Sequence, residues 1–314
     1  MDSILFSLGT VGPVFLIIAI GVLLRRTGLV DSAAAGSLTR LVFHIFLPAL
    51  ILKALITVDF RAEIGLSFVL VVWGALAASF VIAWLAARIA GAREGSRGFF
   101  ASGSTWGNVA IVGYALGEAL YGEEGLARAT IVSALVLPLN TPIGYLAMDR
   151  HPGREGEHRL LSILRRLATN PVILSIVAGF LFNLIRWTPP KIAMDVLAIL
   201  GRASLPLALV AIGASLEFNR DPAGWVEPMG SALVKLVVMP AFAYLGARIA
   251  GLSDPWTGTV VLAFACPTAV SFFVISRSLG YAAPRGAAVV TITTVGAAVT
   301  VGVVAALLKA AGLA

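Results

Sequence analysis

Two short runs of small and polar residues interrupt otherwise apolar stretches of this chain. Residues 103–108 read Gly-Ser-Thr-Trp-Gly-Asn, and residues 265–271 read Ala-Cys-Pro-Thr-Ala-Val-Ser. Because proline removes a backbone donor and glycine makes a helix easy to unwind, both runs predict helix breaks. A helix that restarts after a break presents free N–H groups and a partial positive charge, which attract an anion. The runs therefore predict a site for a carboxylate.

The side chains in these runs are neutral hydrogen-bonding groups that suit a carboxylate. The candidate substrate-binding residues are Thr105, Gly107, Asn108, Pro267, Thr268 and Ser271. A competing interpretation is a pair of packing kinks, because Gly103 and Gly107 have the spacing of small residues that lets helices approach closely. Packing would explain one break alone, whereas two breaks at matching positions favour a binding site.

The two runs hold equivalent positions in an internal repeat. Residues 12–60 align with residues 170–218 at a constant offset of 158 residues, without a gap. After a two-residue slip the alignment resumes, and it pairs Gly107 with Pro267 and Asn108 with Thr268. Transporters built from inverted repeats use two such interrupted helices to form a site at the membrane midplane.

The repeat also pairs two basic residues, His44 and Arg202, each four residues before a proline. Basic side chains in the middle of a membrane span are costly and usually face a cavity or a partner. Arg202 could neutralise an anion, and His44 could bind one or carry a coupling proton. The alternative for both is pairing with backbone carbonyls freed at the proline kink. Asn140 is a weaker candidate, at a polar break near the inner end of its span.

Composition places most of the chain in lipid. Apolar residues make up 59% and charged residues 12%, and the mean hydropathy is +0.96, against about 45–50% apolar and about 25% charged residues in soluble domains. We therefore expect an all-α integral membrane protein. Spans of roughly 20 apolar residues are predicted near residues 4–24, 34–57, 64–90, 97–119, 127–148, 170–186, 191–216, 229–250, 257–279 and 286–310.

Ten spans divide the chain into two halves of opposite orientation. Residues 1–148 form the first five-helix repeat, residues 149–168 a basic cytoplasmic linker, and residues 169–314 the second repeat. Because five is an odd number, the second copy must enter the membrane from the other side. Most arginines fall in the loops of one side, which predicts a cell inner (plasma) membrane protein with both termini outside and the linker inside.

Several classes of function are disfavoured by what the chain lacks. No zinc-binding pattern, phosphate-binding loop or nucleophile triad occurs, so we expect no enzyme, no ATP-driven pump, no cofactor and no metal site. Glu63, Glu118, Asp149 and Glu217 fall near span ends, which argues against a cation exchanger with a buried carboxylate pair. The net charge of +7 comes from arginines in short loops, which indicates topology and not nucleic-acid binding.

Five motifs follow one another along the chain. They are residues 25–29 (Arg-Arg-Thr-Gly-Leu), 46–50 (Phe-Leu-Pro-Ala-Leu), 169–171 (Thr-Asn-Pro), 205–209 (Leu-Pro-Leu-Ala-Leu) with 213–216 (Gly-Ala-Ser-Leu), and 267–270 (Pro-Thr-Ala-Val). In this order they resemble the auxin efflux carrier family, within the bile acid/auxin/arsenite transporter superfamily. The resemblance is closest to short bacterial members labelled malonate or auxin-efflux-type permeases, and it covers essentially the whole chain.

The resemblance implies ten spans in two inverted repeats, a scaffold and a transport bundle, and fourth and ninth helices that cross at broken midpoints. It also implies organic carboxylates as substrates. Asn108 resembles the family's polar residue at the first crossing, and Pro267 and Thr268 resemble the start of the second crossing motif. Ser271 stands where the family often has asparagine, and Gly107 where plant relatives have proline.

The expected function is a secondary transporter of small organic carboxylates, an efflux carrier that works by an elevator-like movement. Three alternatives remain open at this stage: a sodium-coupled symporter of bile-acid-like anions, an anion channel, and a membrane receptor without transport. The expected partners are the lipid bilayer and an organic anion, with no nucleic acid. A homodimer is kept as a candidate assembly.

Overall fold

The computed structural model describes residues 2–57, 65–149, 161, 164–165, 167–218 and 226–314, and within them the protein is all-α. The expected linker at residues 149–168 lies mostly outside the described residues. The elements are α1 (Asp2–Arg26), α2 (Ser32–Leu41), η1 (Val42–Phe46), α3 (Leu47–Thr57), α4 (Leu66–Ile89), α5 (Glu94–Thr105), η2 (Val109–Gly113), α6 (Tyr114–Met148), α8 (Pro171–Leu184), α9 (Lys191–Ala214), α10 (Val226–Leu233), η4 (Val234–Val238), α11 (Met239–Ile249), α12 (Asp254–Ala265), α13 (Val270–Ser278) and α14 (Ala283–Ala310), where η marks a π-helical turn.

Seven helical segments in the described residues are long and apolar enough to cross a membrane. The other expected spans are short or interrupted: α8 has 14 residues, and α12 and α13 are two separate pieces. The expected fourth and fifth spans meet within one 40-residue segment, Val109–Met148, whose helix is broken at Gly122 with φ 66° and ψ −152°. The chain is therefore a multi-pass membrane protein with broken as well as continuous helices.

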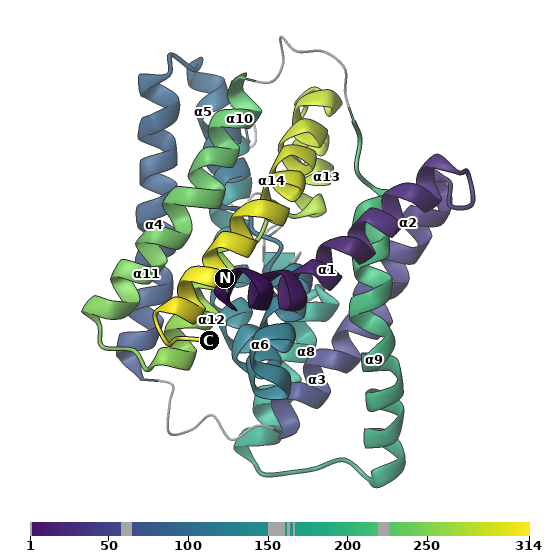
Figure 1. Ribbon diagram of the computed structural model, residues 1–314. Coiled ribbons are helices and arrows are strands. Elements are labelled where there is room, and N and C mark those ends of the chain that lie inside the picture. The colour runs from purple at the N-terminus through teal and green to yellow at the C-terminus, as the bar shows by residue number, and fades with distance from the viewer. Residues whose placement is uncertain (1, 58–64, 150–160, 162–163, 166, 219–225) are drawn as a thin grey trace.

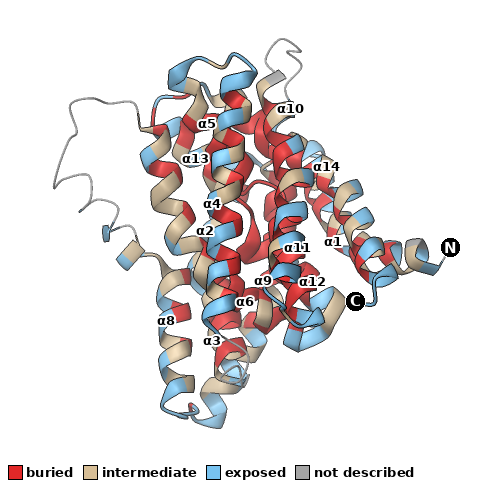
Figure 2. Cartoon of the chain, turned by 90° about the vertical axis from the view of Figure 1, so that its left-hand side faces the viewer, coloured by how far each residue is buried: buried red, intermediate tan, exposed pale blue. Residues whose placement is uncertain are grey.

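The outer faces of the long helices carry large apolar side chains. Leu23 is 58% exposed, Ile192 81% and Ile249 87%. Figure 2 shows buried residues lining the inner faces of the helices and exposed residues on their outer faces. In water such a surface would be unfavourable, but lipid tails solvate it.

The helices separate into two groups, which we name bundle A and bundle B (Figure 1). Bundle A contains α1, α2, η1, α3, α8 and α9, and bundle B contains α4, α5, η2, α6, α10, η4, α11, α12, α13 and α14. Within bundle A, α1 packs on α9 and α3 packs on α8. The bundles meet where α1 contacts α14 and α6, and where α3 contacts α6.

Glycines allow α1 and α9 to approach within backbone contact in bundle A. A Cβ atom added to Gly213 would lie 1.9 Å from the carbonyl oxygen of Ile18, and one added to Gly21 would lie 2.2 Å from that of Val210. Small residues at such contacts let helices associate by close packing in a lipid environment. The α1–α9 contact therefore makes bundle A a tightly packed unit.

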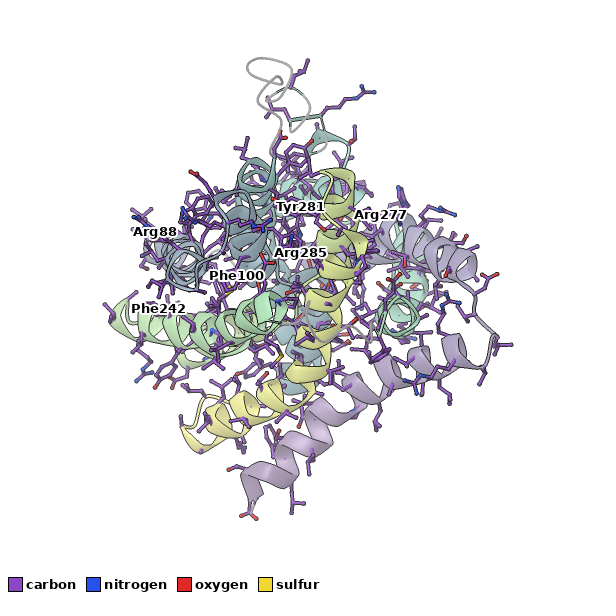
Figure 3. The ribbon with its side chains drawn as sticks, turned by 90° about the horizontal axis from the view of Figure 1, so that it is seen from above. Arg88, Phe100, Phe242, Arg277, Tyr281 and Arg285 are labelled. Carbon is purple, nitrogen blue, oxygen red and sulfur yellow. The ribbon has the colours of Figure 1, made fainter. Side chains whose placement is uncertain are left out.

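Bundle B is held together at one end by contacts around Phe99. Figure 3 labels Tyr281 and Arg285 close together at this end. The ring of Tyr281 stacks on Phe99 with centroids 4.8 Å apart, and the Arg285 guanidinium lies 5.2 Å from the Phe99 centroid. Arg285 also forms an ion pair with Glu227. These contacts join α5, α10 and α14.

Candidate functional site

Both predicted breaks are present, and they lie against each other. Helix α5 ends at Thr105 and η2 begins at Val109, while α12 ends at Ala265 and α13 begins at Val270. Trp106 has a ψ angle of 69° and Cys266 a ψ angle of 144°, both far from helical values. Gly107 and Thr268 form an antiparallel β-bridge. We call residues 106–108 and 266–269 the crossing.

The bridge satisfies the backbone groups that each break releases. The Asn108 N–H donates to the carbonyl of Pro267, and the Ala269 N–H donates to the carbonyl of Trp106, each at 2.8 Å. Since an unpaired backbone group in lipid costs several kcal/mol, each break supplies the partners that the other lacks. In an antiparallel bridge the paired residues face each other across a local two-fold axis, so Asn108 corresponds to Ala269 there and not to Thr268.

Polar side chains from neighbouring helices complete the backbone hydrogen bonding at the crossing. The Thr268 hydroxyl donates to the Gly103 carbonyl at 2.8 Å, and the Thr268 N–H donates to the Thr293 hydroxyl oxygen at 3.1 Å. The Asn140 amide donates to the Thr105 carbonyl at 3.2 Å. Asn140, expected near the inner end of its span, thus contacts the end of α5. The Thr105 and Thr268 hydroxyl groups both use their protons on backbone carbonyls.

Two of the candidate side chains make no hydrogen bond within the described part of the chain. Asn108 is 6% exposed and does not cap the helix that it precedes. Ser271 is half-buried in the first turn of α13. The Asn108 amide keeps a small accessible surface, so it can lack a partner within the protein without the full desolvation cost. Asn108 is therefore the candidate whose hydrogen-bonding capacity is free at the crossing.

Sequence reasoning overlooked one residue at the crossing, Lys235. Its side chain is 1% exposed, and its ammonium donates to the Phe264 carbonyl at 3.0 Å. A Cβ atom added to Gly107 would lie 2.9 Å from the Lys235 Nζ atom. A lysine in the middle of an apolar span, five residues before Pro240, is the sequence signal that could have identified it.

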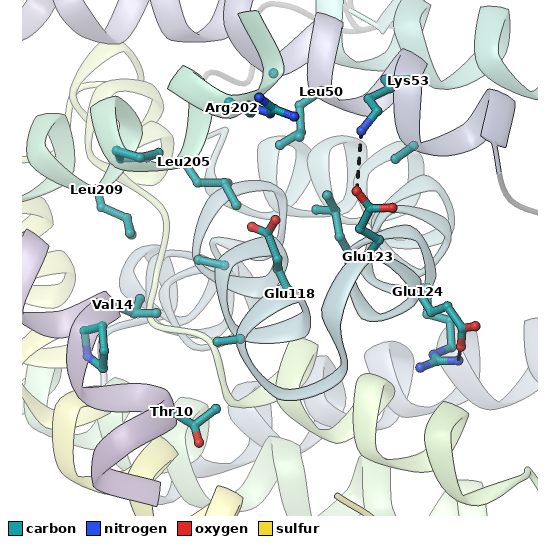
Figure 4. A pocket seen from close by; sticks show the side chains of 18 of the residues that line it. Thr10, Val14, Leu50, Lys53, Glu118, Glu123, Glu124, Arg202, Leu205 and Leu209 are labelled. Atoms are coloured by element: carbon teal, nitrogen blue, oxygen red, sulfur yellow. Dashed lines mark hydrogen bonds and ion pairs between the residues drawn. The ribbon is translucent and has the colours of Figure 1, made fainter. Parts of the chain in front are cut away.

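A cavity of about 1030 Å³ lies between the two bundles. Its walls come from α1, α3 and α9 of bundle A and from α6 and α12 of bundle B. Figure 4 shows Arg202 and Lys53 on one side of this space and Glu118 facing it from the other. Arg202, predicted to face a cavity, thus lines one.

The charges in the cavity are mostly paired. Lys53 lies 3.6 Å from the carboxylate of Glu123, and Arg128 lies 3.3 Å from that of Glu124. Among the described residues, the structure has no ion pair for Arg202. The Arg202 guanidinium is therefore available to a soluble anion that enters the cavity.

His44 does not share the position of Arg202, its partner in the repeat. It is exposed, its Nδ1 donates to the Arg40 carbonyl at 2.8 Å, and it is not part of the cavity lining. This carbonyl lies one turn before His44 and is not the one that Pro48 frees, which is the carbonyl of His44 itself. The two basic residues that the repeat pairs therefore have different surroundings: Arg202 lines the cavity, and His44 does not.

The cavity and the crossing are separate in this structure. Asn108, Thr268 and Ser271 are absent from the cavity wall, which reaches Ala115, two residues after the end of η2. A solute in the cavity would have to pass this layer before it reached the Asn108 amide.

Comparison with known proteins identifies related chains over almost the full length. A model of the family described as "Membrane transport protein" matches residues 6–305. A Rhizobium meliloti (strain 1021) protein named "Putative malonate transporter" is 30% identical over 93% of both chains. A Methanothermobacter thermautotrophicus protein named "Uncharacterized transporter" is 29% identical over 68% of this chain and 69% of its own. The Escherichia coli K12 protein "Uncharacterized transporter YfdV" is 25% identical over 61% of this chain and 62% of its own.

The hydrogen bonding at the crossing predicts different effects for two adjacent threonines. Thr293→Val leaves the buried Thr268 N–H without a partner, which costs about 1–3 kcal/mol, so we expect a lower melting temperature in detergent. Thr294→Val is the matched control, because Thr294 is also buried but its hydroxyl donates only to Val290 in its own helix. Equal melting temperatures for the two variants would contradict this account of the crossing.

Proposed function

Because the chain belongs to the membrane transport protein family, the auxin efflux carriers, we propose that it is a secondary transporter of small organic carboxylate anions. The single observation that carries the proposal is the crossing: two broken helices satisfy each other's backbone, while the Asn108 amide makes no hydrogen bond to the described residues. A neutral donor of this kind is suited to a carboxylate oxygen. The membership excludes an enzyme.

Short dicarboxylates are the proposed substrate class. The relative from Rhizobium meliloti carries malonate in its name and aligns over 93% of both chains. Malonate carries two negative charges, which the Arg202 guanidinium in the cavity would attract, and the Asn108 amide at the crossing is the proposed contact for a carboxylate. The Thr105 and Thr268 hydroxyl protons are used on backbone carbonyls, so we assign these residues, with Gly107 and Pro267, to shaping the site.

We further propose ten membrane crossings in two inverted repeats and transport by movement of bundle B against bundle A. The local two-fold of the bridge between Gly107 and Thr268 supports the inverted repeat. The close packing of α1 on α9 supports bundle A as the stationary scaffold. Since the cavity is bounded by both bundles, a sliding movement would change its access while the crossing stays intact.

Efflux is the proposed direction. In a membrane that is negative inside, export of an anion is favoured by about 2.3 kcal/mol per charge per 100 mV. An exported anion therefore needs no coupling ion to be driven outward.

Counterflow in proteoliposomes tests the function. Vesicles loaded with unlabelled malonate should take up labelled malonate saturably, without sodium and without unitary currents in planar bilayers. A strict sodium requirement would favour the bile-acid-like symporter, and unitary currents would favour an anion channel. If no member of a panel of mono- and dicarboxylates exchanged, the proposal would fail.

Replacing Asn108 should separate binding from stability. Asn108→Ala removes a side chain without an internal partner, so its melting temperature should stay near that of the wild type while malonate binding weakens by about tenfold. Both quantities come from one thermal-shift titration, because ligand binding raises the apparent stability.

The matched control for this experiment is Asn183→Ala, which removes an amide bound to the Leu55 carbonyl at 2.9 Å. It should lower the melting temperature of the substrate-free protein and leave malonate affinity unchanged. Normal affinity in Asn108→Ala would locate the site away from the crossing.

Neutralising Arg202 should distinguish divalent from monovalent anions. Since Arg202 has no ion pair among the described residues and faces the cavity, Arg202→Gln should weaken malonate binding several-fold more than acetate binding, as measured by competition against labelled malonate. Arg248→Gln is the control, because Arg248 pairs with Asp254 outside the cavity. Equal losses for the two anions would assign Arg202 a structural role.

A further inference from the structure

Lys235 is the one lysine with a fully buried side chain among the described residues. It is the second residue of η4, a π-helical turn, and is 1% exposed. Its Nζ atom lies 3.0 Å from the Phe264 carbonyl oxygen and 3.5 Å from the Met239 sulfur. π-Helical turns often occur at functional sites because they displace a side chain from the regular helical position.

The break in α12 explains the first of these contacts. In a continuous helix the Phe264 carbonyl would accept from the N–H of Thr268, but that N–H donates to the Thr293 hydroxyl. The Phe264 carbonyl is one of the unpaired acceptors at the negative end of α12. The Lys235 ammonium caps it and so places a positive charge beside the crossing.

No carboxylate balances this charge in the described part of the chain. Of the ion pairs there, none includes Lys235. A buried ammonium without a counter-charge is strongly unfavourable. The ammonium has three N–H donors, and the carbonyl and the sulfur account for two of them.

The ammonium group lies next to the chain at Gly107. The 2.9 Å separation between Nζ and a hypothetical Cβ at this position means that any larger residue would press on the ammonium. Gly107 is directly followed by Asn108, whose amide has no internal partner. The buried Lys235 ammonium thus lies beside Gly107, the residue that directly precedes Asn108.

We propose that Lys235 is the charge partner of the substrate carboxylate. One N–H stays on the Phe264 carbonyl, another binds one carboxylate oxygen, and the Asn108 amide donates to the other oxygen. This inference rests on the proposed function, since it specifies which groups bind the carboxylate.

Lys235→Met tests the proposal, because methionine keeps much of the side-chain volume and removes the charge. We expect malonate affinity to fall at least about tenfold, as for the loss of a charge-assisted hydrogen bond. The melting temperature of the substrate-free protein should stay equal or rise, since an unbalanced buried charge is removed. Lys191→Met is the matched control: Lys191 pairs with Asp195 at an exposed position that is not in the cavity lining, so affinity should change less than about threefold.

A purely structural cap predicts the opposite pattern for Lys235→Met, with a lower melting temperature and unchanged malonate affinity. That result would overturn the proposal. The proposed function would then still stand if the wild-type protein bound malonate. Absence of binding of any carboxylate to the wild-type protein would instead remove the proposed function and this inference together.

A second measurement does not depend on the folding of Lys235→Met. The chain has four lysines, so replacing Lys53, Lys191 and Lys309 with arginine leaves Lys235 as the only one. With ¹³C-labelled lysine, malonate should shift the Cε resonance of Lys235 along a saturation curve that matches the thermal-shift affinity. A resonance that stays in place at saturating malonate would refute a direct contact.

Discussion

A backbone group that leaves a helix inside a membrane must find its partner within the protein, and this constraint governs the centre of the molecule. The breaks after α5 and α12 each release N–H and carbonyl groups. The bridge between Gly107 and Thr268 pairs them with one another, and side chains from α6, α14 and η4 take up those that remain. Neither break would be stable alone, so the two are required together.

This mutual satisfaction has a chemical consequence for the side chains. Because the backbone partners are supplied by the opposite break, the Asn108 amide is not needed as a helix cap. The threonines at the crossing act differently, since their hydroxyl groups are used on carbonyls. The threonines thus serve only to maintain the break, Asn108 keeps its hydrogen-bonding capacity unused, and Lys235 keeps one donor unused while it caps the Phe264 carbonyl. The side chains on the two sides of the bridge therefore differ, although the backbones that form the bridge are related by a local two-fold axis.

The two bundles give this arrangement a context for transport. The crossing lies within bundle B, whereas the cavity has walls from both bundles. The cavity carries one basic group, Arg202, without an ion pair among the described residues, and it ends before the crossing. A membrane carrier needs a binding site and an access path that are not permanently joined. In this structure the cavity, as the access path, does not reach the crossing, as such a carrier requires.

Sequence alone determined where the helices break and what surrounds them, because glycine and proline act locally and apolar composition reflects the solvent. The all-α membrane class and the breaks near residues 107 and 267 followed from these local effects. Which face of a helix a side chain occupies depends on packing, and only the tertiary structure decided that. It placed Arg202 in the cavity and His44 on the exposed surface, although the repeat aligns them. It also brought Lys235, from a distant span without a conspicuous motif, to the backbone of Gly107.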